Sequence, residues 1–138
     1  MADDSPSIKL VRGYIEAVQR ARASGDADDF GVLREFLAAD VVIKVASPWT
    51  DEPWQVLHRD ADAVITRLQA PINRATSLTT ENVAVQQAGD DVYVEQLSTL
   101  IDDNGTHVSM VCHIFTVFDG LITGVRVYRN ERGSPAFR

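Results

Sequence analysis

The sequence predicts a single α+β domain in which helices packed on one face of a sheet precede a run of antiparallel strands. Apolar residues recur at helical spacing in the first half of the chain, whereas the second half consists of β-rich segments joined by short turn sequences. A length of 138 residues fits one domain with a substantial core, so we expect a single domain over 1–138. Helices gathered ahead of a sheet usually cover one of its faces.

The first helix is predicted to begin after Ser5, a residue suited to the N-cap, with Pro6 at the first helical position. It runs to about Arg22, and Gly25 ends it. Its apolar residues recur three and four positions apart, with Tyr14 beside them: Ile8, Val11, Ile15 and Val18.

A second helix is expected to open at residues 26–29, because acidic residues are favoured in a first turn. Its buried stripe consists of Phe30, Leu33 and Leu37. The β-branched segment 40–46 then predicts a strand.

Residues 47–59 contain two prolines and two tryptophans, which predict an irregular loop. Asp60 can cap a third helix over 61–70, which stops before Pro71.

The second half predicts four consecutive strands separated by Gly, Asp and Asn turns, a pattern typical of neighbouring antiparallel strands. The predicted element order is therefore α-α-β-α-β-β-β-β. The four strands are 77–87, 91–101, 106–118 and 121–130.

Composition disfavours several classes of function. The formal charge of -7 argues against nucleic acid or an anionic membrane as a partner. No apolar run approaches the roughly 18 residues that span a membrane, and the acidic N-terminus does not resemble a signal peptide. The single cysteine, Cys112, cannot form an internal disulfide and is expected to be a buried, inert thiol. We therefore expect a cytoplasmic protein.

The strand 106–118 is apolar through its middle on both faces, which predicts that both faces are covered. Helices can cover only one face. The other face must curl on itself, meet a second subunit or line a cavity, and a strongly curved sheet with an interior pocket satisfies this.

Three segments carry a resemblance to a known family: "VRGYIEAV", "EFLAADVVIKV" and "HIFTVFDGLITGVRVYRN". With the order of elements, they make the chain resemble the nuclear transport factor 2-like superfamily, in its SnoaL-like and ketosteroid-isomerase-like branch. The resemblance covers nearly the whole chain and implies a cone-shaped, curved antiparallel sheet that encloses an apolar pocket. Members include isomerases, polyketide cyclases, dehydratases, epoxide hydrolases and non-catalytic binding modules.

The resemblance implies that His113 stands where cyclases and isomerases of this branch have an aspartate, and that Tyr14 matches the helix-1 tyrosine of the isomerases. In ketosteroid isomerase a tyrosine and a protonated aspartate hold an oxyanion. Tyr14 and His113 can both donate hydrogen bonds, so together they could hold a developing enolate. The isomerase base position corresponds to Val45, which carries no carboxylate, so isomerisation by that mechanism is not expected.

The expected pocket also has polar and aromatic groups. Gln96 and Ser98 can orient a carbonyl or hydroxyl group of a ligand. Trp49 and Trp54 lie in the segment that rims the open end of the cone in this family; they could clamp a flat apolar ligand, plug the mouth or seal a dimer. Asp51, Glu52 and His58 share that segment and are expected to be solvated unless the loop folds inward. The predicted lining is Val94, Gln96, Ser98, Val111, His113 and Val127.

Two other chemistries are not supported by the sequence. Epoxide hydrolases of this superfamily use an Asp-Arg-Asp set, for which the corresponding residues are Gln96, Ser98 and Val127. The three histidines lack metal-ligand spacing, and His107 and His113 are roughly 20 Å apart along one strand. We expect no metal and no cofactor.

Two classes of function stay open. One is a cofactor-independent isomerase, cyclase or dehydratase that acts on a small, largely apolar substrate, including polycyclic ones, through His113 and Tyr14. The other is a binding or dimerisation module that lost its catalytic carboxylates. In either case we expect a homodimer through the outer face of the sheet, which presents Tyr93, Glu95, Leu97 and Thr99.

Overall fold

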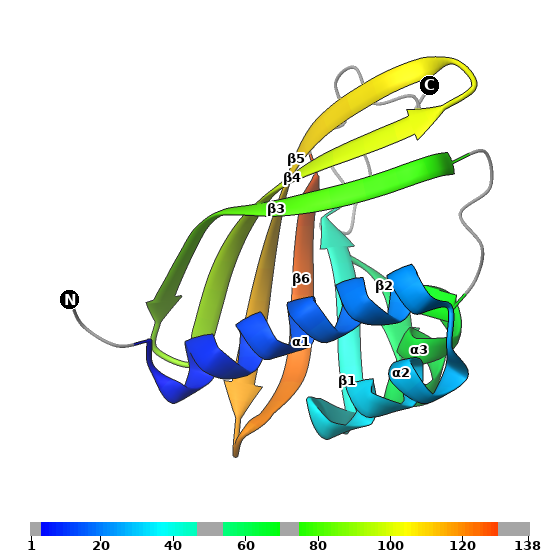
Figure 1. The fold of residues 1–138 in the computed structure, drawn as a ribbon. Helices are drawn as coiled ribbons and strands as arrows, with labels where there is room; N and C mark the ends of the chain where they lie inside the picture. Colours follow the sequence, from blue (N-terminus) through cyan, green and yellow to red (C-terminus); the bar gives the residue numbers. More distant parts are fainter. Residues whose placement is uncertain (1–3, 47–53, 70–74, 130–138) are drawn as a thin grey trace.

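A computed structural model describes residues 4–46, 54–69 and 75–129 (Figure 1). Three α-helices and a 3-10 helix pack against a six-stranded sheet. The elements are α1 Pro6–Ser24, α2 Ala27–Gly31, η1 Val32–Glu35, β1 Leu37–Ala46, β2 Trp54–Arg59, α3 Ala61–Gln69, β3 Ala75–Ala88, β4 Asp91–Asp102, β5 Gly105–Phe118 and β6 Leu121–Arg129. No helix in the described ranges is long and apolar enough to cross a membrane.

The boundaries of α1 confirm the capping prediction. The Ser5 hydroxyl oxygen accepts a hydrogen bond from the Ile8 amide at 3.1 Å, and Pro6 occupies the first turn. Gly25 ends the helix with φ 67° and donates its amide to the Ala21 carbonyl at 2.8 Å. This left-handed conformation favours glycine.

The second predicted helix is shorter than its apolar spacing suggested. It ends at Gly31 and continues as η1 to Glu35, and Leu37 already belongs to β1. Phe30, Leu33 and Leu37 are nevertheless all buried. The prediction that these three residues are buried is correct. The prediction that Leu37 belongs to the helix is wrong, because a 3-10 turn followed by the start of a strand can also place apolar residues three to four positions apart.

The prediction of an irregular loop over 47–59 is wrong for its second half. Residues 54–59 form β2, an antiparallel partner of β1 in which His58 pairs with Ile43. Both prolines precede this strand in the sequence, so neither removes a hydrogen bond from its ladder. Asp60 follows with φ 73°, and its carboxylate accepts the Ala63 amide at 2.8 Å, which confirms the predicted cap of α3.

The sheet has the strand order β2-β1-β6-β5-β4-β3. Strand β1 pairs in parallel with β6, whereas every other pair is antiparallel, so the sheet is mixed and the prediction of an antiparallel sheet is wrong for this one pair. The four predicted strands of the second half are confirmed as β3 to β6. The sheet does not close, because β2 and β3 form its two edges.

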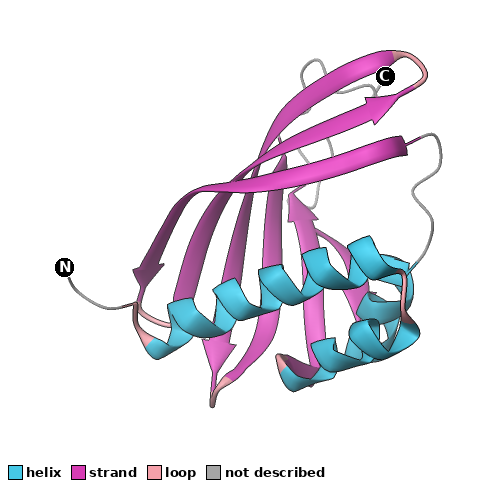
Figure 2. Ribbon diagram, viewed as in Figure 1, coloured by secondary structure: helices cyan, strands magenta, loops and turns pink. Residues whose placement is uncertain are grey.

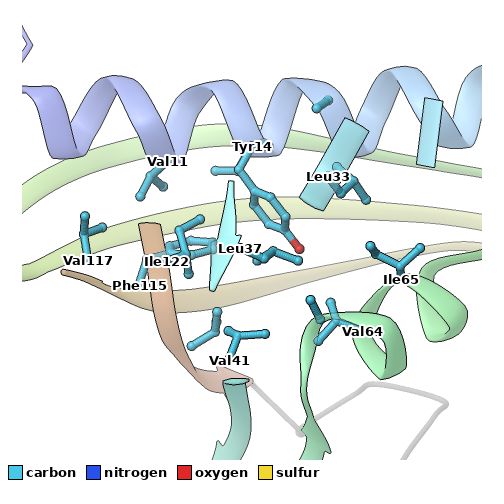
Figure 3. Close-up of a cluster of buried hydrophobic side chains, with 14 of the residues drawn as sticks. Val11, Tyr14, Leu33, Leu37, Val41, Val64, Ile65, Phe115, Val117 and Ile122 are labelled. Carbon is cyan, nitrogen blue, oxygen red and sulfur yellow. The ribbon is translucent and has the colours of Figure 1, made fainter. Parts of the chain in front are cut away.

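All helices lie on the concave side of the curved sheet (Figures 1 and 2). Two side-chain contacts join α1 to β3: the Ser5 hydroxyl donates to the Gln87 side-chain oxygen, and Gln19 Nε2 donates to Thr80 Oγ1 at 2.9 Å. The core lies between α1 and the sheet and includes Val11, Tyr14, Leu33, Leu37, Val41, Phe115, Val117 and Ile122 (Figure 3). Helices packed on the concave side of a curved sheet confirm the predicted cone-like α+β fold.

No helix in the described part of the chain covers the convex face of the sheet (Figure 1). Val108 is 62% exposed and Phe118 is 69% exposed. Cys112 lies on the same face and is half-buried. Burial and the neighbouring Glu95 raise the pKa of its thiol, which makes it a poor nucleophile.

Candidate functional site

Four of the expected pocket residues form one row across the concave face. Val45 of β1 is level with Val127 of β6, Val127 pairs with His113 of β5, and His113 pairs with Val94 of β4. Paired residues on neighbouring strands point to the same side of a sheet, so these four side chains share one face. The expectation that the pocket lies on the face opposite the helices is therefore wrong, because His113 and its row neighbours lie on the concave face, which also packs the helices.

The next two rows toward the β4–β5 turn are more polar. Val111 pairs with Gln96, and Gln96 pairs with Asn82 of β3. Gln96 is only 7% exposed, and its Nε2 donates to Asn82 Oδ1 at 3.0 Å. Ser98 pairs with Ser109 one row further on. The structure therefore brings Gln96, Ser98 and Val111 onto the same face as His113.

The environment of His113 is largely apolar. Its ring lies 5.8 Å from the Phe115 ring, centroid to centroid, at an interplanar angle of 33°. Its row neighbours Val94 and Val127 are buried, and its Nδ1 atom is inaccessible to solvent. The imidazole is therefore half-buried among apolar neighbours on the concave face.

Tyr14 projects from α1 toward the buried cluster that includes Leu37 (Figure 3). The residue is 7% exposed, and its ring makes edge-on contacts with Phe36 and Phe115 at centroid distances of 6.3 and 6.0 Å. Burial raises the pKa of the phenol to about 12, against a smaller opposing effect of Arg22. Among the described residues, the hydroxyl has no hydrogen-bond partner. At neutral pH Tyr14 is therefore a hydrogen-bond donor and not a base.

Tyr14 and His113 approach each other through Phe115. Both rings contact the Phe115 ring, one from α1 and one from the same strand. The Tyr14 hydroxyl makes no direct hydrogen bond to His113, since it bonds to none of the described residues. A molecule lying over this aromatic group would have a phenol donor and an imidazole within one apolar surface.

Trp54 does not join this group. Trp54 packs against Tyr128 with ring centroids 5.1 Å apart, and Tyr128 pairs with Cys112 on the convex face. The structure thus places Trp54 on the side of the sheet opposite His113. Trp49, Asp51 and Glu52 lie outside the described residues.

Sequence reasoning missed three polar groups that face the candidate site. Asn82 bonds to Gln96, Thr80 bonds to Gln19 and pairs with Ser98, and Ser109 pairs with Ser98 from β5. The register of β3 shifts between Asn82 and Ala84, which moves even-numbered residues onto the concave face. Strand alternation alone predicts that Ser109 faces the site. Asn82 and Thr80 face it only because of this bulge, so alternation could not predict their orientation.

A surface depression of about 260 Å³ lies elsewhere, between η1, the start of β1 and the start of α3. Its walls are Arg34, Leu37, Ala39, Ala61 and Asp62, and Arg34 is ion-paired with Asp62. None of the candidate pocket residues borders it. In the described part of the chain, no three His, Cys, Asp or Glu side chains are arranged to hold a metal ion.

Comparisons with known proteins agree with this architecture. An LEH-like epoxide hydrolase from M. tuberculosis is 22% identical, with 93% of this chain and 85% of that chain covered and a TM-score of 0.67. A protein assigned as a SnoaL-like polyketide cyclase from Jannaschia sp. CCS1 is 18% identical, with 94% and 92% covered and a TM-score of 0.66. A protein assigned as a ketosteroid isomerase from Kribbella flavida is 19% identical, with 94% and 82% covered and a TM-score of 0.68. At these identities the likeness shows the fold alone.

No sequence among curated proteins matches the chain significantly. The model of the SnoaL-like domain, in contrast, matches residues 11–125. Because this match spans most of the 138 residues, the chain belongs to the family of SnoaL-like domains.

Proposed function

We propose that the concave face binds a small, largely apolar molecule, including polycyclic ones, and carries out cofactor-independent acid/base chemistry on it. The observation that carries this proposal is Tyr14, whose ring is buried and whose hydroxyl bonds to none of the described residues. The O–H group of Tyr14 is therefore available to donate a hydrogen bond to a carbonyl oxygen of a bound ligand.

The raised pKa of Tyr14 restricts its role. With a pKa of about 12 the phenol keeps its proton at neutral pH, so it can polarise a carbonyl group and hold the enolate that forms. A separate group must remove the proton. His113 is the titratable side chain on the same face that also contacts Phe115, and an imidazole accepts protons near neutral pH.

The proposed step is proton abstraction next to a carbonyl. His113 takes a proton from carbon, the electron pair of the broken C–H bond moves onto the carbonyl oxygen, and Tyr14 donates a hydrogen bond to that oxygen. Return of the proton at another carbon gives isomerisation, and attack of the enolate carbon on a second carbonyl gives cyclisation; loss of a neighbouring hydroxyl gives dehydration. Names of structurally similar proteins, a polyketide cyclase and a ketosteroid isomerase, support this class. The substrate would contact Val45, Gln96, Ser98, Val111 and Val127.

Hydrolysis of epoxides is not proposed, although one structurally similar protein is an epoxide hydrolase. The Asp-Arg-Asp set expected for that reaction corresponds to Gln96, Ser98 and Val127. Gln96 bonds to Asn82, and Val127 is part of the core. These side chains supply neither a carboxylate to activate water nor a proton for the epoxide oxygen.

The binding proposal is tested with two probes of similar size, 2-acetylnaphthalene and 2-ethylnaphthalene, which differ in the carbonyl oxygen. We expect the ketone to bind about tenfold more tightly, or about 1.4 kcal/mol. Tyr14→Phe should remove this preference, and Tyr93→Phe, on the exposed convex face, should keep it. Equal affinity of the wild type for both probes, or an unchanged preference in Tyr14→Phe, would contradict the role of Tyr14.

A second variant tests His113. His113→Phe keeps the size of the ring in an apolar row and should fold at least as well as the wild type. It should lose at least about tenfold in affinity for the ketone probe or in its deprotonation, followed as exchange of the acetyl protons in deuterium oxide. A stable His113→Phe protein with unchanged binding and exchange would show that the ring is only structural.

The alternative is a non-catalytic binding or dimerisation module, and the convex face favours it. Large apolar side chains there are exposed, among them Tyr93, Val108, Met110, Phe118 and Tyr128. We propose that a second copy of the chain covers this face, around Tyr93, Glu95, Leu97 and Thr99. Light scattering should then give twice the chain mass of 15.2 kDa, and Leu97→Lys should give the single mass. We also propose a cytoplasmic location, which suits the free Cys112.

A further inference from the structure

Asp102 and His107 form a pair at the open rim of the concave face, well away from Tyr14 and His113. Asp102 ends β4, and His107 lies two residues into β5, across the β4–β5 turn. His107 Nε2 lies 3.1 Å from Asp102 Oδ1. His107 is six residues from His113 on the same strand face, which is roughly 20 Å along the strand.

The two members of this pair differ in exposure. The Asp102 side chain is 6% exposed, whereas that of His107 is 26% exposed. The next residue in the turn, Asp103, is exposed, so a turn at this position does not by itself require a buried carboxylate. Asp102 Oδ1 also accepts the Asn104 amide at 2.8 Å, which fixes the carboxylate in place.

This geometry determines which nitrogen of His107 is basic. An ionised carboxylate can only accept hydrogen bonds, so the 3.1 Å contact places the ring proton on Nε2. Nδ1 then carries the lone pair. A carboxylate behind an imidazole both orients the ring and stabilises the imidazolium that forms when Nδ1 takes a proton.

Two hydroxyl groups lie next to the pair on the same face. Ser109 follows His107 by two residues on β5, and Ser98 pairs with Ser109 from β4. Both serines are half-buried. A serine hydroxyl can donate a hydrogen bond to an oxygen that gives up its proton to His107.

We infer that Asp102, His107, Ser98 and Ser109 form a second, proton-accepting site that binds molecules with a phenolic or enolic hydroxyl group. The ligand O–H bond breaks as the proton moves to His107 Nδ1, and the electron pair stays on the ligand oxygen. Asp102 balances the imidazolium charge, and the serine hydroxyls donate to the oxyanion. This site deepens the proposed function by naming a substrate class for the same concave face, but it does not require Tyr14.

The test uses 2-naphthol and naphthalene, which differ only in the hydroxyl group. We expect 2-naphthol to bind the wild type about tenfold more tightly, with the red-shifted absorption of the naphtholate. Asp102→Asn and His107→Leu should each reduce the preference below about twofold. Asp103→Asn is the matched control, because it removes a neighbouring exposed carboxylate, and it should leave the preference unchanged.

Nitrogen NMR of His107 gives a local readout that needs no variant to fold. We expect an Nε2-protonated tautomer in the free protein and a shift of the Nδ1 signal when 2-naphthol binds. Preference for 2-naphthol that survives both variants, or a His107 signal that does not respond, would overturn the inference. Equal binding of naphthalene and 2-naphthol, or no binding of 2-naphthol, would overturn the inference, whereas binding of 2-acetylnaphthalene tests the proposed function separately.

Discussion

The concave face of the sheet has two halves that differ in composition although the same strands build both. Under α1, the row of Val92, Phe115 and Val125 is apolar and buried. Further along the strands, the rows toward the β4–β5 turn carry Gln96, Asn82, Ser98, Ser109 and His107. The row of His113 lies between the two halves. The first half holds the fold together, and the second, which contributes less to stability, is the half in which polar chemistry can be placed.

The largest effect should come from the half under α1. Phe115 is 3% exposed and contacts Tyr14 and His113, whereas Phe118 on the same strand is 69% exposed. Phe115→Ala should lower the free energy of unfolding by about 3–5 kcal/mol, and Phe118→Ala by less than about 0.5 kcal/mol. Urea unfolding measures both. Similar losses for the two variants would contradict the assignment of the faces.

Alkaline pH should lower the stability of the protein, because Tyr14, in the half of the concave face under α1, ionises. The folded protein raises the pKa of this phenol from 10.0 to about 12, so its contribution is complete below pH 10 and is lost as the pH rises toward 12. Between pH 8 and pH 11 the wild type should lose about 1.4 kcal/mol more stability than Tyr14→Phe. Urea unfolding of both proteins at the two pH values gives this difference, and parallel losses would show that the Tyr14 phenol is not buried.

The smallest effect is expected at the start of the polar half. Gln96 Nε2 donates to Asn82 Oδ1, so Gln96→Leu alone leaves a half-buried amide without this partner and should cost about 1 kcal/mol. Adding Asn82→Val should restore most of the stability, since both partners are then apolar. The double variant should nevertheless bind 2-acetylnaphthalene less well. If the double variant lost more stability than the sum of the losses of the two single variants, the pair would contribute to folding stability and not to ligand binding.

Much of this fold could be predicted from the sequence because local signals and tertiary packing agree. The caps at Ser5 and Asp60 and the four strands of the second half are formed as predicted. Strand β2 could not be recognised, because the two prolines just before it indicate an irregular segment. The parallel pairing of β1 with β6 is likewise set by the whole topology.

The candidate site was predicted less completely than the fold. Alternation along β5 put His113 and Val111 on one face, and the register confirms that they share it with Val127 of β6. Trp54 was expected at the pocket, but β2 turns it toward Tyr128 on the convex face. The pair of Asp102 and His107 could not be recognised, since it depends on how the β4–β5 turn closes.

The most direct test of whether the ligand binds on the concave face is valine-methyl NMR during a titration with 2-acetylnaphthalene. Val111 and Val45 face the candidate site from β5 and β1, whereas Val83 and Val108 are exposed. The account predicts contacts between probe protons and the methyl groups of Val111 and Val45, with shift changes there and none at Val83 or Val108. Contacts confined to Val83 and Val108 would place the ligand outside the cone and contradict the account.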